Sequence, residues 1–277
     1  MSLSFGFSPC PNDTFIVDAM LHHKIATSGY RFSPVIEDVE DLNERAFRGE
    51  LDITKLSYHS FLHLTDTYQM LSSGSALGFG VGPLLIAKNA LTDDEINTGR
   101  VALPGKWTTA HWLFSLRYPE AVNKSFMLFS DIEKAVAEDR VIAGVIIHEN
   151  RFTYADRGFV KIIDLGAHWE GTTGLPIPLG GIAVKRSMDD KVKREILQLI
   201  KASIGYAYQN PGSASDFIHH HAQEMDPTVL RKHIDLYVNA YSLDLKSEGK
   251  EAIRKMFELS AGKGIIKGYQ PDYLFTG

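Results

Sequence analysis

Apolar and polar residues alternate at the start of the chain, and the spacing then becomes helical. The stretch "LSFGFS" (3–8) has the alternation of a strand and is followed by Pro9 and Pro11. Apolar side chains recur at helical spacing in residues 13–24, and residues 51–57 again read as a short strand. Because strands and helices continue to alternate, the pattern predicts an α/β fold with mainly parallel strands.

The same criteria extend this pattern over the rest of the chain. Further strands are predicted at 83–89, from Arg100, at 125–129, at 140–149 and at 181–185. Further helices are predicted at 38–50, 58–68, from Thr108 or Thr109, at 130–139, 189–209, 227–241 and 247–261. Ser130 and Glu133 have the spacing of a capping box at the start of one of these helices.

The length of the chain favours two domains. It has 277 residues, of which 44% are hydrophobic, and single cores tend to split near this size. Crossovers near 88–92 and 174–180 predict a larger discontinuous α/β domain, 1–89 plus 180–277, and a smaller inserted α/β domain, 90–179. A ligand is then expected in a cleft between two lobes, where strands end and helices begin.

Charge and composition exclude several classes of binding partner for this protein. The formal net charge is -5 and no run of Lys or Arg occurs, so we expect no nucleic acid partner. Cys10 is the single cysteine, which excludes an internal disulfide, and no sequence neighbour obviously activates it as a nucleophile. The first residues lack a signal-peptide pattern and no apolar run approaches roughly 20 residues, so we expect a cytoplasmic protein without a membrane partner.

Polar residues gather where two predicted strands end. Ser8, Asn12 and Asp13 follow the first strand, where they either contact a ligand or bond the amides of the turn. Lys55 and Ser57 end the strand 51–57. The alternative for this pair is a solvated lysine and a serine that caps the next helix.

A third candidate lies at Thr108, Thr109 and Ala110, after the break at Pro104 and Gly105. A helix that opens here offers free backbone N–H groups and a hydroxyl to a carboxylate or another anion. A plain N-cap explains the threonines equally simply, because Thr is a common capping residue.

His148 ends the apolar run of "AGVIIHENRFTY" (143–154), with Asn150, Arg151 and Tyr154 close behind it. A histidine at a strand's carboxyl end can accept a proton near neutral pH, and α/β folds place chemistry at such ends. The alternative is a core histidine bonded to a backbone carbonyl. We expect the three polar residues to hold the turn and orient the imidazole.

No motif for a metal or an organic cofactor is present. Residues 219–221 are three consecutive histidines on a predicted helix, so they point to different sides and cannot chelate one ion. The chain has no HExxH, no paired cysteines and no GxGxxG after a strand, and the glycine-rich segment 74–82 lacks the Lys and hydroxyl of a P-loop. We therefore expect no metal and no cofactor.

Several ordered motifs together resemble one family, 1,4-dihydroxy-6-naphthoate synthase of the futalosine route to menaquinone. They are "SPCPNDTF", "DVEDLN", "KLSYHS", "LLSSGSALGFGVGPL", "PGKWTTA", "GVIIHENRFTY", "TGLPIPLGG" and "LYVNAYSLDL". The resemblance implies a two-lobed fold like that of type II periplasmic binding proteins. It also implies a cofactor-free carbon–carbon lyase that converts cyclic dehypoxanthinyl futalosine to 1,4-dihydroxy-6-naphthoate and a three-carbon fragment, expected to be dihydroxyacetone.

The resemblance also assigns residues. It implies that His148 is the proton acceptor and that the "KLS" and "TTA" segments contact the substrate. With Asn12 added from the first strand-to-helix turn, the predicted substrate-binding residues are Lys55, Leu56, Ser57, Thr109, Ala110 and Asn12. The expected partner is a small-molecule carboxylate, and a homo-oligomer is possible.

Two other functions are compatible with the same fold. Chorismate dehydratase acts earlier in the same route, but we do not expect the "VIIHENRFTY" pattern in it. A non-catalytic protein that captures an anion or another solute is the alternative from a different class. It would release its ligand unchanged and is expected to carry an export signal or a lipid anchor.

Overall fold

Contacts within the chain divide it into two units. We describe a computed structural model that covers residues 1–222, 226–271 and 274–276. Unit 1 comprises Met1–Gly78 and Pro178–Gly277, and unit 2 comprises Phe79–Ile177. One unit is therefore discontinuous in sequence, and the other is inserted into it.

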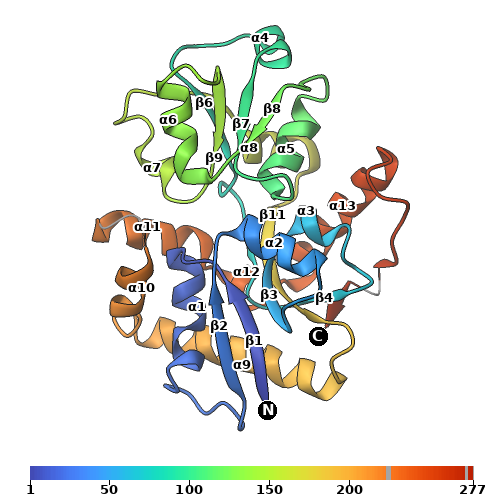
Figure 1. Cartoon of the computed structure of the whole chain (residues 1–277). Coiled ribbons are helices and arrows are strands. Elements are labelled where there is room, and N and C mark those ends of the chain that lie inside the picture. The colour runs from blue at the N-terminus through green and yellow to red at the C-terminus, as the bar shows by residue number, and fades with distance from the viewer. Residues whose placement is uncertain (223–225, 272–273, 277) are drawn as a thin grey trace. The chain divides into compact units, whose positions relative to one another are not determined.

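A seven-stranded mixed sheet forms the centre of unit 1 (Figure 1). Its strands are β1 (Ser2–Phe7), β2 (Arg31–Ile36), β3 (Ile53–Ser57), β4 (Tyr68–Leu71), β5 (Ala76–Gly78), β11 (Ile177–Lys185) and β12 (Phe275–Thr276). The strand order is β12-β4-β11-β3-β1-β2, with β5 paired to β11. Strand β1 runs parallel to both β2 and β3, so these three strands end at the same edge of the sheet.

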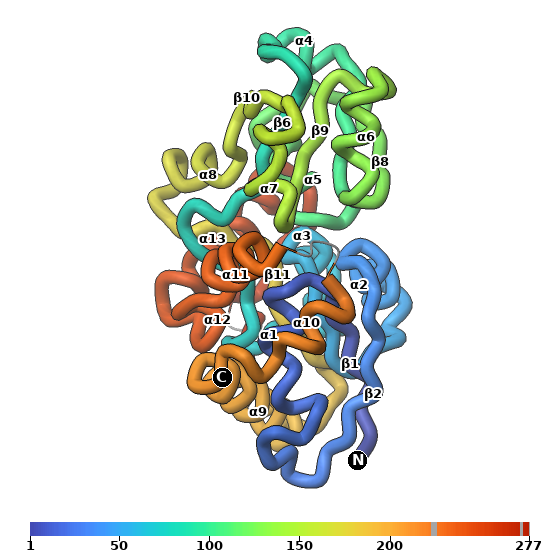
Figure 2. The backbone as a smooth tube through the Cα atoms, turned by 90° about the vertical axis from the view of Figure 1, so that its left-hand side faces the viewer, coloured from blue at the N-terminus to red at the C-terminus, as the bar shows by residue number. Residues whose placement is uncertain are grey.

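Helices pack against this sheet and against one another. They are α1 (Pro11–Leu21), α2 (Val39–Phe47), α3 (Tyr58–Phe61), α9 (Asp190–Gln209), α10 (Ser215–His221), α11 (Pro227–Tyr237), α12 (Ala240–Leu243) and α13 (Lys246–Gly262). Helix α1 contacts α9, α10 and α11, which surround it in Figures 1 and 2. Every residue of α1 except Leu21 is buried, so polar residues on this helix need partners inside the protein.

Unit 2 has a five-stranded mixed sheet in the order β10-β6-β9-β7-β8. Its strands are β6 (Leu84–Ala87), β7 (Val101–Leu103), β8 (Lys124–Phe126), β9 (Ala143–Ile146) and β10 (Val160–Asp164). Its helices are α4 (Asp93–Thr98), α5 (Thr109–Arg117), α6 (Ile132–Ala137), α7 (Asn150–Thr153) and α8 (Leu165–Thr173), with a 3-10 turn, η1 (Phe129–Asp131). Strand β7 is parallel to β8 and β9, so these three share a carboxyl edge.

The chain passes from unit 1 to unit 2 before β6 and returns to unit 1 at β11, and the pairing of these two strands explains where the units divide. Strand β6 runs antiparallel to β9 and β10 in unit 2, and β11 runs antiparallel to β3 and β4 in unit 1. The sheets are therefore mixed rather than mainly parallel. In the structure the first boundary lies between residues 78 and 79, ahead of β6, whereas the sequence predicted it between 89 and 90. The second boundary lies between residues 177 and 178, whereas the sequence predicted it between 179 and 180.

Two local predictions were wrong. Helix α3 spans only Tyr58–Phe61 instead of 58–68, because the chain turns and Tyr68 already pairs in β4. The capping box at Ser130 does not form, because this residue lies within η1 and α6 starts at Ile132 without a side-chain cap. Glu133 instead pairs with Arg157.

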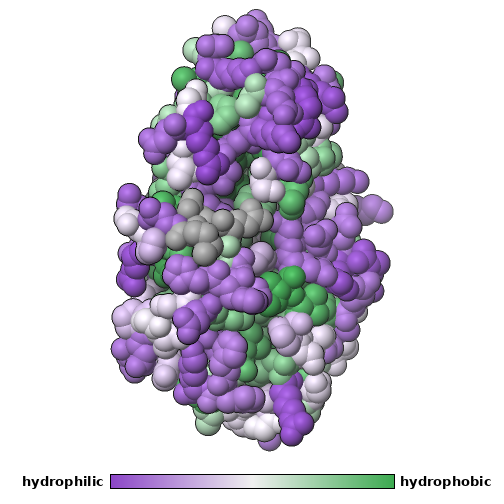
Figure 3. Space-filling view, turned by 60° about the vertical axis from the view of Figure 1, so that its left-hand side comes forward, coloured by the Kyte–Doolittle hydropathy of each residue, from purple (hydrophilic) through white to green (hydrophobic). Residues whose placement is uncertain are grey.

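The apolar residues fill a core in each unit. The larger core packs β1, α1 and α9 together, and the smaller one packs β6, β9 and α6 together. The face drawn in Figure 3 is mostly hydrophilic, with smaller apolar areas. Within the described part of the chain, no helix is long and apolar enough to cross a membrane.

Candidate functional site

A buried ion pair lies where β1 and β3 end. Lys55 Nζ is 2.6 Å from Asp13 Oδ1, and the two side chains are only 6% and 4% exposed. Lys55 belongs to β3, and Asp13 stands in the first turn of α1, directly after β1. The parallel pairing of the two strands therefore brings together residues that are 42 positions apart.

The Asp13 carboxylate accepts four hydrogen bonds. Its Oδ2 accepts from the backbone N–H of Ser8 at 3.2 Å and from the Ser8 hydroxyl at 2.7 Å. Its Oδ1 accepts from Asn12 Nδ2 at 2.9 Å and from Lys55. A carboxylate has about four acceptor positions, so this one is saturated and held in a single orientation. Such a group is a good anchor for a cation.

The Lys55 ammonium keeps one donor for a ligand. Besides Asp13, its Nζ meets the Gly74 carbonyl at 3.4 Å, a long contact. An ammonium has three N–H groups, and within residues 1–222, 226–271 and 274–276 the third has no acceptor. A buried cation with an open donor is a suitable partner for an anionic group.

Ser57 is fixed by Asn43 of α2. The backbone N–H of Ser57 donates to Asn43 Oδ1 at 3.0 Å, and Asn43 Nδ2 donates to the Ser57 hydroxyl at 3.1 Å. Ser60 Oγ also donates to Asn43 Oδ1, at 2.8 Å. The Ser57 hydroxyl accepts in this arrangement, and since no described residue accepts its own proton, that proton is left for a ligand.

Leu56 offers only its main chain. Its side chain is fully buried. Its carbonyl faces Gly180 of β11 so closely that a Cβ at this glycine would lie 2.6 Å from the oxygen. The tight pairing holds the "KLS" segment rigidly in the centre of the sheet.

Asn12 uses both polar atoms of its side chain. Nδ2 donates to Asp13, and Oδ1 lies 2.9 Å from Nε2 of His233 on α11. His233 is fully buried, and its ring lies 4.7 Å from that of Tyr237. Asn12 therefore links α11 to the ion pair. With respect to the described residues, one N–H of its amide and one lone pair of its oxygen are left for a substrate.

In unit 2, Thr108 caps α5. Its hydroxyl accepts from the His111 N–H at 3.3 Å and donates to the Gly105 carbonyl at 3.0 Å, so the simple capping interpretation is right for this threonine. Thr109 and Ala110 are the first helical residues and are buried. Their backbone N–H groups belong to the first turn, where an α-helix lacks internal acceptors.

His111 also lies in the first turn of α5, and its environment keeps the imidazole neutral. Burial lowers the pKa of His111 to about 4, against an ordinary value of 6.5, and the Lys124 charge adds to the effect. Nδ1 lies 2.7 Å from the Lys106 carbonyl, and Nε2 lies 3.4 Å from Lys124 Nζ. With both ring nitrogens engaged, His111 is a structural residue rather than a proton acceptor.

His148 stands in a turn directly after β9. Its φ is 57°, in the left-handed region that non-glycine residues rarely occupy. Its ring packs edge-on against Phe129 with centroids 4.8 Å apart. Strained backbone of this kind is concentrated at functional sites. Because β7 and β9 are parallel, His148 and Thr109 follow strands that end at the same edge.

The residues behind His148 are not solvated side chains. Arg151 Nη1 donates to the Gly82 carbonyl at 2.9 Å, and its Nη2 lies 3.6 Å from Asp164 Oδ2. Asn150 is buried, and Tyr154 packs against the core of unit 2. These contacts tie the segment after the turn to β6 and β10. An orienting effect on the imidazole stays a prediction.

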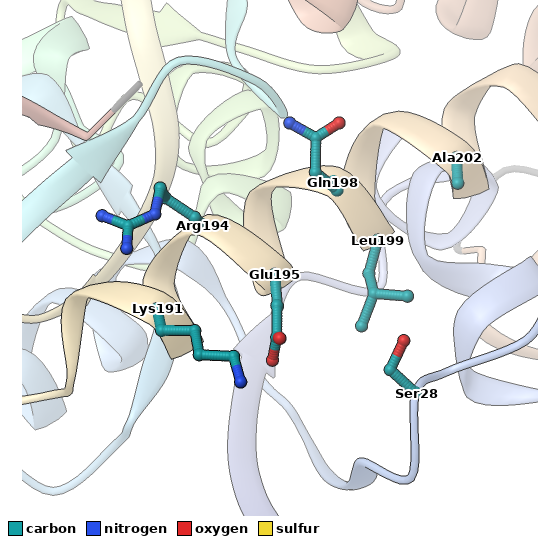
Figure 4. A pocket seen from close by; sticks show the side chains of 7 residues that line it. All are labelled: Ser28, Lys191, Arg194, Glu195, Gln198, Leu199 and Ala202. Carbon is teal, nitrogen blue, oxygen red and sulfur yellow. The ribbon is translucent and has the colours of Figure 1, made fainter.

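A shallow pocket in unit 1 lies apart from these groups. It is lined by α9, including Lys191, Arg194 and Glu195, and by Ser28 from the loop before β2 (Figure 4). None of the predicted site residues lines it. Its charges are mixed and lie at the surface. Among the described residues, no group of three or more His, Cys, Asp or Glu is placed to hold a metal ion.

Comparison with known proteins decides the family. A family model described as menaquinone biosynthesis matches residues 3–261. The chain belongs to this family. A Thermus thermophilus member named 1,4-dihydroxy-6-naphthoate synthase is 43% identical over 264 residues, covering 95% of this chain and 96% of the relative. A Streptomyces coelicolor member of the same name is 38% identical, with coverage of 99% and 98%. The predicted resemblance is confirmed.

Solved structures agree on the fold. A crystal structure of an Archaeoglobus fulgidus protein superposes with a TM-score of 0.90 at 34% identity, covering 96% of this chain and 98% of that one. The alkanesulfonate-binding protein of Xanthomonas axonopodis pv. citri gives a TM-score of 0.72 at 14% identity, with coverage of 98% and 95%. The second likeness concerns the fold alone. The predicted α/β fold of the periplasmic-binding-protein type is confirmed.

The sequence pattern missed two polar residues that contact the predicted binding residues. Asn43 and His233 hold Ser57 and Asn12, respectively. Asn43 follows Leu42 on the buried side of α2, so an amide inside an otherwise apolar face was the available signal. For His233 no such signal existed, because its partner is 221 positions away.

Proposed function

We propose that this protein is a 1,4-dihydroxy-6-naphthoate synthase. It converts cyclic dehypoxanthinyl futalosine to 1,4-dihydroxy-6-naphthoate with release of a three-carbon fragment, dihydroxyacetone. The observation that carries this proposal is the near full-length similarity, at 43% and 38% identity, to two relatives that bear that name. A second support is His148 in the strained turn after β9, because a histidine can act as the base that this reaction needs.

His148 acts as the general base. Its imidazole removes a proton from a hydroxyl on the sugar-derived part of the substrate. The carbonyl of the three-carbon fragment forms as the neighbouring C–C bond breaks, and the electron pair of that bond passes into the ring system. Aromatisation to the naphthalene draws the reaction forward. General-base catalysis contributes roughly 10²–10⁴-fold, and orientation of the substrate supplies much of the remainder.

The other predicted residues bind the substrate, a small-molecule carboxylate. In unit 1, the open N–H of Lys55 suits the carboxylate and the Ser57 hydroxyl donates a further hydrogen bond, while Leu56 and Asn12 complete this part. In unit 2, Thr109 and Ala110 provide backbone N–H groups at the start of α5. We propose no metal and no cofactor for these steps, and a cytoplasmic location.

A product assay tests the proposal. Purified wild-type protein and the His148→Ala variant are incubated with cyclic dehypoxanthinyl futalosine, and products are separated by chromatography. Wild-type protein is expected to form the naphthoate and dihydroxyacetone in equal amounts, and the variant only traces. Unchanged substrate with the wild type, or wild-type rates with the variant, would contradict the assignment.

In the matched control, chorismate takes the place of cyclic dehypoxanthinyl futalosine. Wild-type protein is incubated with chorismate under the same conditions and is expected to leave it unchanged. Dehydration of chorismate would identify the earlier enzyme of the route instead. Recovery of both compounds intact would favour a solute-binding protein.

A further inference from the structure

A continuous chain of side-chain hydrogen bonds runs from α11 to Lys55 within unit 1. His233 Nε2 lies 2.9 Å from Asn12 Oδ1, Asn12 Nδ2 lies 2.9 Å from Asp13 Oδ1, and that oxygen lies 2.6 Å from Lys55 Nζ. All four residues are at least nine-tenths buried. The proposed reaction uses Lys55 at one end and gives His233 at the other end no task.

The charge of Asp13 fixes the direction of this chain. A flipped Asn12 amide would set its oxygen against the carboxylate, where two acceptors repel each other, so Nδ2 must face Asp13. Oδ1 then faces His233 and accepts, so His233 Nε2 carries a proton. Each bond in the chain thus orients the next, and polarisation along it strengthens them all.

Local contacts alone do not fix the Asn12 amide. Asn12 is the second residue of α1, and within the described part of the chain its side chain hydrogen-bonds to Asp13 and His233. Without the His233 donor, the amide is free to rotate away from the carboxylate. Asp13 would then lose one of the two donors on Oδ1 and turn, carrying the Lys55 ammonium with it.

We propose that His233 is a positioning residue for substrate binding. Its Nε2–H orients the Asn12 amide, the amide orients Asp13, and Asp13 holds the Lys55 ammonium where it meets the substrate carboxylate. The inference rests on the proposed function, because it assigns His233 to the binding half of that reaction. His233 contacts no reacting atom, so its loss weakens substrate binding and spares the proton transfer at His148.

Steady-state kinetics with two His233 variants tests this role. In His233→Leu the donor is lost, and we expect a KM about tenfold higher with kcat within about twofold, the signature of lost uniform binding. In His233→Gln, Nε2 of the glutamine occupies the position of the imidazole Nε2, and we expect KM to return to within about threefold of wild type. An unchanged KM in His233→Leu, or a Gln variant no better than Leu, overturns the inference.

Leu230→Ala is the control for structural damage. Leu230 is buried on the same helix, and its side chain makes no hydrogen bond. We expect this variant to melt at a lower temperature and to keep the wild-type KM. If Leu230→Ala raises KM as much as His233→Leu does, His233 has only a packing role and the inference fails.

A double-mutant cycle gives a second, independent measurement. Asn12→Leu removes both the link to Asp13 and the contact of Asn12 with the substrate, so the double variant Asn12→Leu/His233→Leu is expected to have the KM of Asn12→Leu alone. A KM in the double variant that is the product of the two single effects would show that the two residues act separately and would overturn the proposal. If His233→Leu does not fold, His233→Phe, which keeps a ring but has no donor, takes its place and is expected to raise KM to the same extent, and a wild-type KM in that variant overturns the inference.

Failure of the proposed function gives a different result. Wild-type protein that does not convert the cyclic substrate contradicts the enzyme assignment, and the inference falls with it. If the wild-type protein converts the cyclic substrate and His233→Leu has the wild-type KM, only the inference about His233 is overturned and the enzyme assignment stands. The two failures are therefore distinguished by the wild-type assay.

Discussion

Asp13 in unit 1 and His148 in unit 2 both follow the carboxyl end of a strand that has at least one parallel neighbour, yet their surroundings differ. Asp13 lies in a regular helix, accepts four hydrogen bonds and is paired with Lys55. His148 lies in a left-handed turn with an aromatic edge against its ring. Four hydrogen bonds therefore fix Asp13, whereas a left-handed backbone and a ring contact with Phe129 contribute to the position of His148.

This difference matches the two tasks we propose. A group that anchors a cation works best when it cannot move, and a carboxylate with four hydrogen-bond donors meets this condition. A general base must expose a lone pair to the substrate, so it cannot have both nitrogens occupied. His111, with both nitrogens engaged, shows what unit 2 does with a histidine that serves structure.

The largest expected effect separates catalysis from binding. We expect His148→Ala to lower kcat by roughly 10²–10⁴-fold with little change in KM. Ser57→Ala is expected to raise KM by about threefold to tenfold and to keep kcat, because it removes one neutral hydrogen bond. Initial rates over a range of substrate concentrations measure both. A kcat loss in Ser57→Ala equal to that of His148→Ala would remove the proposed division of labour.

The next effect concerns the stability of unit 1. Asp13→Asn leaves the buried Lys55 ammonium without its counter-charge, so we expect a loss of about 3–5 kcal/mol in the free energy of unfolding. Urea titration followed by circular dichroism measures it. Asp66→Asn, at an exposed position, is the matched control and is expected to stay within about 0.5 kcal/mol of wild type. Equal midpoints for the two variants would show that the ion pair does not stabilise unit 1.

A smaller effect tests strain in unit 2. Both His148→Gly and His148→Ala lose the imidazole, but only glycine adopts a φ of 57° without a penalty. We expect the glycine variant to be about 1–2 kcal/mol more stable than the alanine variant. At Glu149, where φ is -65°, the same comparison is expected to reverse, with glycine less stable than alanine by about 0.5–1 kcal/mol. The same sign at both positions would mean that the turn is unstrained.

The last expected effect is a pH dependence that arises from His111. Burial lowers its pKa in the folded protein to about 4 from 6.5, so the unfolded chain binds this proton first as pH falls. The stability that the neutral imidazole contributes is present above pH 6.5 and is lost between 6.5 and 4. His111→Gln should therefore flatten the plot of unfolding free energy against pH in this window. An unchanged slope, measured by urea titration at several pH values, would show that His111 is solvated.

Part of the candidate site could be predicted from local sequence. The strand that ends in "KLS", the turn after Pro104 and the apolar run that ends at His148 each mark a strand end followed by polar residues, which requires only short-range pattern. The Ser130 capping box failed because η1 forms ahead of α6 and takes up the residue expected to cap it. Short-range pattern therefore identified the segments better than it identified their hydrogen bonds.

The sequence by itself determined the family, the strand ends and the residue types available there, because periodicity and motifs are properties of neighbouring positions. Only the tertiary structure decided which of those residues meet. The parallel pairing of β1 with β3 brings Asp13 to Lys55, and the packing of α11 against α1 brings His233 to Asn12. Contacts between positions so far apart depend on the complete fold, and no local pattern encodes them.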